Sequence, residues 1–390
     1  MCDMPEQKNY LILTDSRFAG AASAELRRRC QIKVAERSRY NDITMMVAEL
    51  SSKNDAVSLL SARFSFIDFM MPIDVVLLDV TDTEMLHSPV FDLVKSIGLR
   101  DIVIEIKKIY SNVGGNAKSI EVELGERLEQ HGIYPNLVSP KSVIYIVLIG
   151  NNAFIGHTVA ENPQKIDHFR FASKIENRQI NRAEFKLREA INYFNINLKG
   201  IKACLDIGAA PGGWTHLLLQ NSLKVVAVDY SDLDYSMMEG KRILVLAESK
   251  DTESVRESAG RIGVEVAELG KNINTQGFDL VHLKSHIDRN DIIPMLSGLW
   301  KFDLLCIDVN SATSDVIPLA AKLSSLLSEG AILLVTAKLS TDVIEDHVKD
   351  VMVGLSKNYC EIQIKKLPHN RMEFTVFAVV KPVYKLVYKH

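Results

Sequence analysis

The chain has 390 residues, of which 47% are hydrophobic and 24% are charged, and its formal net charge is −3 at pH 7. This composition is typical of a globular protein with two or three domains. The charge balance excludes binding of nucleic acid through overall charge alone, so an anionic partner would need a local basic patch.

Cysteine usage and apolar stretches narrow the class of protein further. The five cysteines are odd in number and none lies in a CxxC pair, which argues against a zinc site and a disulfide framework. The start, MCDMPEQKNY, lacks the pattern of a signal peptide. Apolar runs such as FMMPIDVVLLDV are broken before they could span a membrane. We therefore expect a cytoplasmic protein that holds no metal.

The N-terminal part of the chain predicts one or two small α+β units. Strands are expected from Asn9 (YLIL), at VVLLDV and at DIVIEIKKI, with a helix over AASAELRRRC. A second, amphipathic helix is expected over AKSIEVELGERLEQHG, and SVIYIVLIG and AFIGHTV predict a hairpin. Residues 161–182 lack an apolar period and are the expected linker, which gives predicted domains at 1–85, 86–160 and 183–390.

Beyond the linker, strands alternate with helices, which predicts an α/β domain with a doubly wound, mostly parallel sheet. The expected strands lie at 203–207, 224–228, 279–283, 303–307, 331–336 and 373–380. Residues 241–278 read as an insertion between two of these strands, and their role is not assigned.

The stretch CLDIGAAPGGWTHLL predicts a strand, a glycine-rich turn and the start of a helix. A phosphate-binding loop would need Lys-Ser/Thr after the glycines, and a dinucleotide turn would need GxGxxG; neither pattern is present. S-adenosylmethionine carries cationic groups instead of phosphate, and acids at strand ends suit it: Asp206, and Asp229 for the ribose hydroxyls. A tight turn without any ligand also remains open.

The motif DIGAAPGGW resembles motif I of the FtsJ/RrmJ-type ribose 2′-O-methyltransferases, which reads D-L-G-x-x-P-G-G-W/F. In that family a Lys-Asp-Lys-Glu tetrad is catalytic, and the resemblance implies Lys186, Asp308, Lys338 and Glu373 here. It also implies a Rossmann-like domain over roughly 182–385 that binds S-adenosylmethionine. The implied cofactor-binding residues are Asp206, Gly208, Pro211, Gly212, Gly213, Trp214, Asp229, His286 and Asp308. The match is nearest to the RlmM-like branch, but LKSHIDR lacks the acid that the resemblance implies near the adenine. His286 or Ile287 is the expected substitute, or Asp288 is a displaced acid.

The chemistry of a ribose hydroxyl suggests a role for each tetrad residue. The hydroxyl must lose a proton as it attacks the methyl group, and a lysine is a base only when burial or a nearby cation depresses its pKa. Our hypothesis makes Lys338 the base, Lys186 the nearby cation, Asp308 the group that orients Lys338, and Glu373 a partner of Lys186 or of the ribose. Taken singly, each of these residues could be an ordinary surface charge.

A second resemblance concerns the N-terminal part. The helix after residue 116, the connector IYPNLVSPK and the hairpin IYIVLIGNNAFIG resemble a THUMP domain, an RNA-binding module, and a ferredoxin-like unit would precede it. Basic residues repeat every four positions toward the site and predict a phosphate-contacting stripe. The candidate RNA-binding residues are Arg170, Lys174, Arg178, Arg182 and Arg371.

These observations favour an RNA ribose 2′-O-methyltransferase. The THUMP resemblance favours tRNA as the substrate, and the RlmM-like resemblance favours large-subunit rRNA; we expect tRNA. A base methyltransferase would carry an Asn/Asp-Pro-Pro-Tyr-like loop where this chain has DVNSAT. The sequence also leaves open a non-catalytic RNA-binding protein with a relic pocket and, more remotely, a dehydrogenase.

Overall fold

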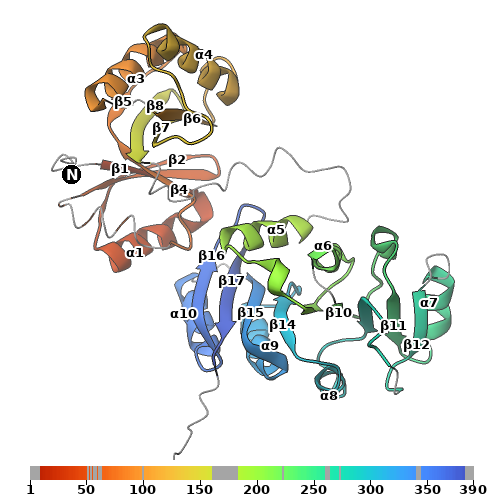
Figure 1. The fold of residues 1–390 in the computed structure, drawn as a ribbon. Coiled ribbons are helices and arrows are strands. Elements are labelled where there is room, and N and C mark those ends of the chain that lie inside the picture. The colour runs from red at the N-terminus through yellow and green to blue at the C-terminus, as the bar shows by residue number, and fades with distance from the viewer. Residues whose placement is uncertain are drawn as a thin grey trace, which may run out of the picture. The chain divides into compact units, whose positions relative to one another are not determined.

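A computed structural model describes residues 9–50, 52, 55, 59, 64–98, 101–159, 183–221, 224–259, 264–271, 274–339 and 344–382. The chain divides into two compact units, Met1–Asp167 and His168–His390. Figure 1 labels the helices and strands of both units.

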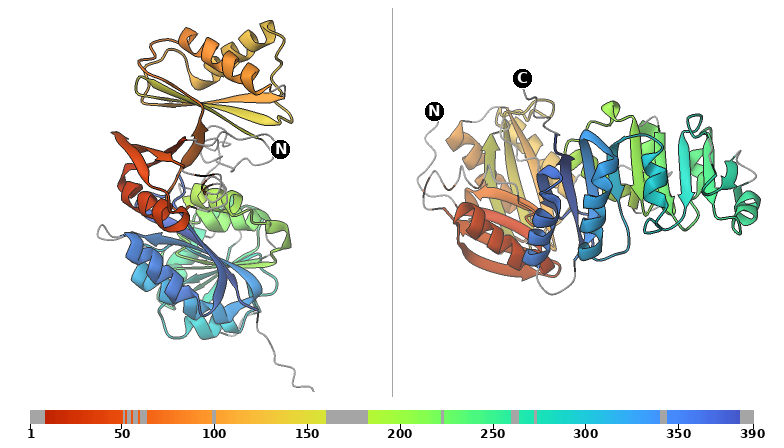
Figure 2. Two further views of the ribbon diagram at one scale, coloured as in Figure 1. Left: turned by 90° about the vertical axis from the view of Figure 1, so that its left-hand side faces the viewer. Right: turned by 90° about the horizontal axis from the view of Figure 1, so that it is seen from below.

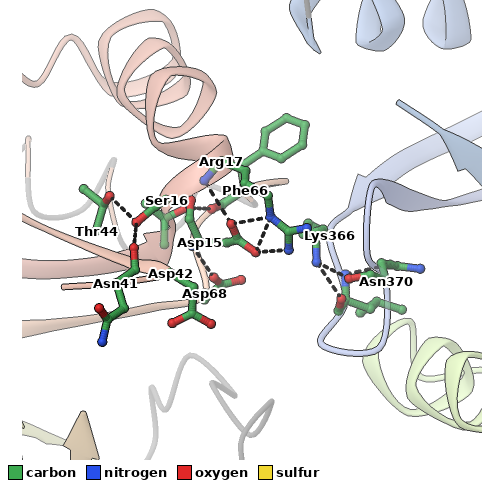
Figure 3. A network of polar contacts seen from close by, with 12 residues as sticks. Asp15, Ser16, Arg17, Asn41, Asp42, Thr44, Phe66, Asp68, Lys366 and Asn370 are labelled. Atoms are coloured by element: carbon green, nitrogen blue, oxygen red, sulfur yellow. Dashed lines mark hydrogen bonds and ion pairs between the residues drawn. The ribbon is translucent and has the colours of Figure 1, made fainter. Parts of the chain in front are cut away.

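The first unit begins with a four-stranded antiparallel sheet of order β2-β3-β1-β4. Its elements are β1 (Asn9–Asp15), η1 (Ser16–Phe18), α1 (Ala19–Cys30), β2 (Val34–Tyr40), β3 (Ile43–Glu49) and β4 (Phe69–Ile73). The predicted strand from Asn9 and the predicted helix over AASAELRRRC are confirmed. At the end of β1 the Asp15 carboxylate caps η1 by accepting from the Arg17 backbone N–H at 2.9 Å, and it also faces the Arg17 guanidinium (Figure 3).

A second four-stranded sheet, of order β5-β8-β7-β6, completes the first unit. Its elements are β5 (Val75–Leu77), α3 (Glu84–Ile97), β6 (Ile102–Ile109), α4 (Ala117–Gln130), β7 (Ser142–Ile149) and β8 (Asn152–Val159). The predicted helix and hairpin are therefore present, with Ile120, Leu124 and Leu128 buried as their spacing requires. β5 pairs with β8, and the predicted domain boundary at residue 85 lies inside α3.

The two sheets of this unit pack directly on each other. Leu11, Phe69 and Met71 of the first sheet share a buried cluster with Tyr145 and Val147 of the second. A Cβ added at Gly156 would lie 1.8 Å from the Pro72 carbonyl oxygen, so only glycine permits this approach of β8 to β4.

The second unit is built on a nine-stranded sheet of order β12-β11-β13-β10-β9-β14-β15-β17-β16. All neighbours from β12 to β15 are parallel, and β17 and β16 are antiparallel additions. The strands are β9 (Ala203–Ile207), β10 (Lys224–Asp229), β11 (Ile243–Ala247), β12 (Val264–Glu268), β13 (Leu280–Lys284), β14 (Phe302–Ile307), β15 (Leu327–Lys338), β16 (Tyr359–Lys365) and β17 (Glu373–Val380).

Helices cover both faces of this sheet (Figure 2). They are α5 (Ala183–Tyr193), η3 (Leu198–Gly200), α6 (Gly213–Asn221), η4 (Tyr235–Met238), α7 (Thr252–Ala259), α8 (Ile292–Ser297), α9 (Thr313–Leu323), η5 (Ser324–Leu326) and α10 (Ile344–Leu355). One face packs on α5 and α6, where Leu187 and Leu218 share a buried cluster with alternate strand residues such as Cys204 and Val225. α9 and α10 pack together on the opposite face.

The expected α/β class is confirmed: the second unit is a Rossmann-like domain with a mostly parallel sheet. All six predicted strands are present within a few residues of their expected bounds. The unassigned stretch 241–278 contains β11, α7 and β12, so it extends the sheet at one edge instead of forming a separate insertion. Within the described part of the chain, every helix is too short or too polar to cross a membrane.

Candidate active site

The glycine turn lies between β9 and α6, at the carboxyl edge of the parallel strands. Gly208 has φ +78°, and a Cβ there would lie 2.7 Å from the carbonyl oxygen of Asp308. The Gly208 N–H donates to the Val228 carbonyl at 3.0 Å, so the turn is tied to the end of β10. Gly212 has φ +113° and a Cβ there would lie 2.9 Å from the Met238 side chain. Side chains are thus excluded at both positions, because atoms of the chain itself fill the space that a Cβ would take.

The Asp206 carboxyl is fully buried near the end of β9. Its Oδ2 accepts a hydrogen bond of 2.6 Å from the Thr215 hydroxyl, while its Oδ1 lacks a hydrogen-bond partner among the described residues. Burial raises the pKa of Asp206 to about 7, against the Thr215 hydrogen bond, and the negative charges of Asp308 and Asp229 raise it further. A cationic ligand beside this carboxyl would relieve that cost.

Asp229, at the end of β10, braces the turn. Its Oδ2 accepts from the Ala210 N–H at 3.0 Å and its Oδ1 from the Ser231 N–H at 2.8 Å. Each carboxylate oxygen has a further lone pair, so Asp229 retains the capacity to accept from ribose hydroxyls. Pro211, beside Ala210, follows a cis peptide bond.

His286 is exposed just beyond β13, the strand next to β10. Its ring stacks on that of Tyr230, with centroids 4.3 Å apart and planes inclined by 21°. Tyr230, which is 61% exposed, was not anticipated from the sequence, although it directly follows Asp229. The two rings form an aromatic surface at the strand ends.

Three of the four tetrad residues meet. The Lys186 ammonium on α5 lies 2.7 Å from Oε2 of Glu373 on β17 and 3.3 Å from Oδ1 of Asp308, which follows β14. All three side chains are between 14% and 17% exposed. They come together near the middle of the sheet. On one side of β9 the sheet continues through β10, and on the other side it continues through β14. Ligand sites in such sheets form at this switch point, beyond the carboxyl ends of the strands.

The electrostatics of Asp308 follow from this arrangement. Burial raises its pKa, the Lys186 cation lowers it, and the Glu373 carboxylate raises it again. The net direction of the Asp308 pKa is upward, so burial and the Glu373 charge together outweigh the Lys186 cation.

Lys338 ends β15 and is opposite Glu373 in the antiparallel register of β15 and β17. Its ammonium donates to the side-chain oxygen of Asn310, and its carbonyl accepts from the Thr313 hydroxyl. The hypothesis that Asp308 orients Lys338 therefore differs from the structure, in which Asp308 contacts Lys186. Asn310 was missed, although it lies two residues after Asp308 in DVN.

Trp214 contacts the start of α5, the helix that carries Lys186. It is 3% exposed and packs within the core, and its indole N–H donates to the Ala183 carbonyl at 2.6 Å. Because Ala183 starts the helix that carries Lys186, Trp214 fixes where that helix begins. The predicted cofactor contact of Trp214 stays a prediction, and Gly213 starts α6 beside it.

The loop before β17 is also fixed to α5. The His369 ring stacks on Phe185 with centroids 4.9 Å apart, and its Nδ1 lies 2.5 Å from Oε1 of Glu189. Within the same loop, the buried Lys366 ammonium donates to the Asn370 carbonyl (Figure 3). These contacts hold the segment that leads into Glu373.

The predicted RNA-binding residues divide into two groups. Arg371 is exposed in the loop before Glu373. The remaining four lie outside the described residues: Arg170, Lys174, Arg178 and Arg182.

The residues at this edge fit S-adenosylmethionine. The negative charges of Asp308 and Asp229 add to burial in raising the pKa of Asp206. A ligand with a sulfonium and an ammonium group would offset that clustering of negative charge. Gly208 and Gly212 give the turn backbone angles, φ +78° and +113°, that side chains rarely adopt.

Comparison with known proteins identifies the second unit. The family model for FtsJ-like methyltransferases matches residues 179–384. Over 132 residues the chain is 28% identical to ribosomal RNA large subunit methyltransferase M of Pseudomonas syringae pv. syringae, covering 31% of this chain and 36% of that protein. It is 30% identical over 111 residues to the protein of the same name from Shewanella denitrificans, covering 25% and 29%.

The chain thus spans about a third of the length of these curated relatives. Among solved structures, TrmN from Thermus thermophilus is similar at 12% identity and a TM-score of 0.34, covering 96% of this chain and 100% of that chain. The family match extends over more than half of the chain and includes the glycine turn and all four tetrad residues. The chain belongs to the FtsJ-like methyltransferase family, whose methyl donor is S-adenosylmethionine.

Proposed function

We propose that this protein transfers a methyl group from S-adenosylmethionine to the 2′-hydroxyl of a ribose in structured RNA. The observation that carries the proposal is the contact of Lys186 with Asp308 and Glu373, with Lys338 at the neighbouring register position beside the glycine turn. Two lysines and two carboxylates at one strand edge suit proton removal from a hydroxyl next to a cationic donor.

Lys338 is the general base in this proposal. Its partner is the neutral amide of Asn310, whereas Lys186 faces two carboxylates. A neutral partner suits an amine that must take up a proton, and paired carboxylates suit a lysine that keeps its charge. Asn310 then aims the Lys338 amine, which is the role that the sequence had suggested for Asp308.

Lys186 is the fixed cation. It stabilises the negative charge that develops on the ribose oxygen as the proton leaves. Asp308 and Glu373 both contact its ammonium and hold it in place. The Asp308 carboxylate would also face the donor.

The donor and the ribose must also be aligned. S-adenosylmethionine, when bound, supplies an electrophilic methyl carbon. Asp206 and Asp229 would hold its cationic and ribose groups, with Gly208, Pro211 and Gly212 against its chain and Gly213 at the start of α6. The stacked Tyr230 and His286 would contact the adenine. Alignment of this kind supplies much of the rate enhancement in group transfer.

Two observations bear on the class of RNA that is methylated, and they favour different classes. The resemblance of α4 and the β7–β8 hairpin to a THUMP domain favours tRNA, which is our proposal. The printed names of the curated relatives refer to large-subunit rRNA and favour that alternative. Arg371 and the stripe of Arg170, Lys174, Arg178 and Arg182 would contact RNA phosphates.

The proposal is tested with the purified full chain, labelled S-adenosylmethionine, and total tRNA or rRNA in separate reactions. We expect label in one RNA class, and at least about a hundredfold loss of rate in Lys338→Met with donor binding retained. Lys322→Met, at an exposed position of α9, is the matched control and should keep full activity. Undiminished turnover by Lys338→Met would remove the assigned base.

A further inference from the structure

A cavity lies on the face of the sheet opposite the α5–α6 core, toward the amino ends of β9, β10 and β14. It measures about 720 Å³, within the range of small-molecule sites. It opens where β9, β10 and β14 begin, whereas the tetrad lies where β9 and β14 end. A five-residue strand separates the two edges by roughly 15 Å, so this cavity is distinct from the candidate active site.

The lining of the cavity is strongly basic in a chain of net charge −3. Four of its residues are lysines and one is an acid, Asp303. Asp303 is already engaged, because its Oδ2 accepts from the backbone N–H groups of Lys202 and Ala203 at 2.9 and 3.3 Å. The remaining lining is neutral. The lysines are Lys202, Lys224, Lys271 and Lys301.

Most of these ammonium groups are not neutralised by carboxylates. Lys224 donates to the Gln276 carbonyl at 2.8 Å and Lys301 to the Ser325 carbonyl, both of which are uncharged acceptors. Lys271 does have an acidic partner, at 2.9 Å. Within the described ranges, Lys202, Lys224 and Lys301 form no ion pair. Their charge is therefore available to an anion.

Trp300 gives the cavity an aromatic wall. The Lys224 ammonium lies 4.8 Å from the centroid of its ring, which holds that charge at the cavity. Asn274 and Gln276 add amide groups to the same lining.

We propose that this cavity binds the phosphate group of a nucleotide, with the lysines around the phosphate and the polar amides toward the rest of the ligand. Ammonium groups and an aromatic ring are the groups that recognise the phosphate and the base of a nucleotide. The nucleotide can be part of an RNA chain or a free mononucleotide. The inference does not depend on methyl transfer, because it uses no tetrad residue.

The full chain allows a direct test, because it has two tryptophans and the other, Trp214, is buried in the core. Tryptophan fluorescence is followed while 5′-AMP, a short oligouridylate or adenosine is added. We expect a saturable change in fluorescence with at least one of the two phosphate-bearing probes, oligouridylate or AMP. We expect no change with adenosine, which lacks the phosphate. Binding of oligouridylate only assigns the cavity to RNA, and binding of AMP assigns it to free nucleotides. Loss of the signal in Trp300→Phe locates it.

Substitutions then test the lysines. Lys224→Gln with Lys301→Gln should weaken binding about a hundredfold, because each of the two charged contacts to phosphate contributes about tenfold. Lys322→Gln with Lys349→Gln removes the same charge from exposed positions of α9 and α10 and should leave binding unchanged. If the first pair fails to fold, exposed Lys202→Gln serves in its place. No saturable binding of any phosphate-bearing probe, or equal binding by the cavity and control variants, would overturn the proposal.

Discussion

Replacing Lys186 by Met would leave two part-buried carboxylates facing each other. In the native site the Lys186 ammonium lies 2.7 Å from Glu373 and 3.3 Å from Asp308, and the three side chains are at most 17% exposed. Methionine keeps the length and the packing of the aliphatic stem but removes the charge. The Asp308 pKa, which is already raised by burial and by Glu373, should rise further.

The cost can be estimated from the contacts that are lost. Removing one partner of a buried ion pair destabilises by about 3–5 kcal/mol, and hydrogen bonds to charged groups contribute about 1.5–3 kcal/mol each. Because this site retains some contact with solvent, we expect the lower end, about 3 kcal/mol. The double variant Lys186→Met with Glu373→Gln should recover about 1 kcal/mol, since one of the two opposed charges is gone.

Urea unfolding of the full chain, followed by tryptophan fluorescence, measures this, because both tryptophans lie in the second unit. Lys349→Met, on exposed α10, is the matched control and should unfold like the native chain. A Lys186→Met variant within 0.5 kcal/mol of the native chain (about the scatter of exposed substitutions), or a double variant less stable than the single one, would refute the three-residue contact.

Three further predictions concern the turn and its supports. Because burial raises the pKa of Asp206 in the folded chain to about 7, the free energy of unfolding should fall as pH rises from about 4 to 7. Asp206→Asn should remove this loss, which is up to about 4 kcal/mol, when unfolding is measured across that pH range. Gly208→Ala should abolish donor binding in calorimetry, because its Cβ would lie 2.7 Å from the Asp308 carbonyl at φ +78°; unchanged affinity would contradict this geometry of the turn. Trp214→Phe should lose the 2.6 Å bond to Ala183, about 1 kcal/mol of stability, and lower the methylation rate while donor affinity holds.

The sequence predicted the buried strands of the second unit because such strands are continuous apolar runs between turns. β9 and β10 are buried along almost their whole length and were placed within a residue. β2 was missed because VAERSRY is largely exposed and carries no apolar alternation. β11 was missed for another reason: ILVLA is apolar, but it was grouped with the polar residues around it.

The site was predicted in its residue types but not in its contacts. The order of Lys186, Asp308, Lys338 and Glu373 along the chain does not reveal which lysine faces the carboxylates. That depends on β17 running antiparallel to β15 and on α5 being fixed by Trp214 and the loop before β17. For the same reason the sequence offered no sign of the lysine-lined cavity, whose residues come from six separate segments.

The acceptor atom is identified by where the label is found in RNA methylated by the full chain. After alkaline hydrolysis, a 2′-O-methyl ribose protects its own phosphodiester, so methyl transfer to the ribose predicts label in dinucleotides from one RNA class. Label confined to mononucleotides would mean that a base is the acceptor, and it would contradict the roles given to Lys186, Lys338 and their carboxylate partners.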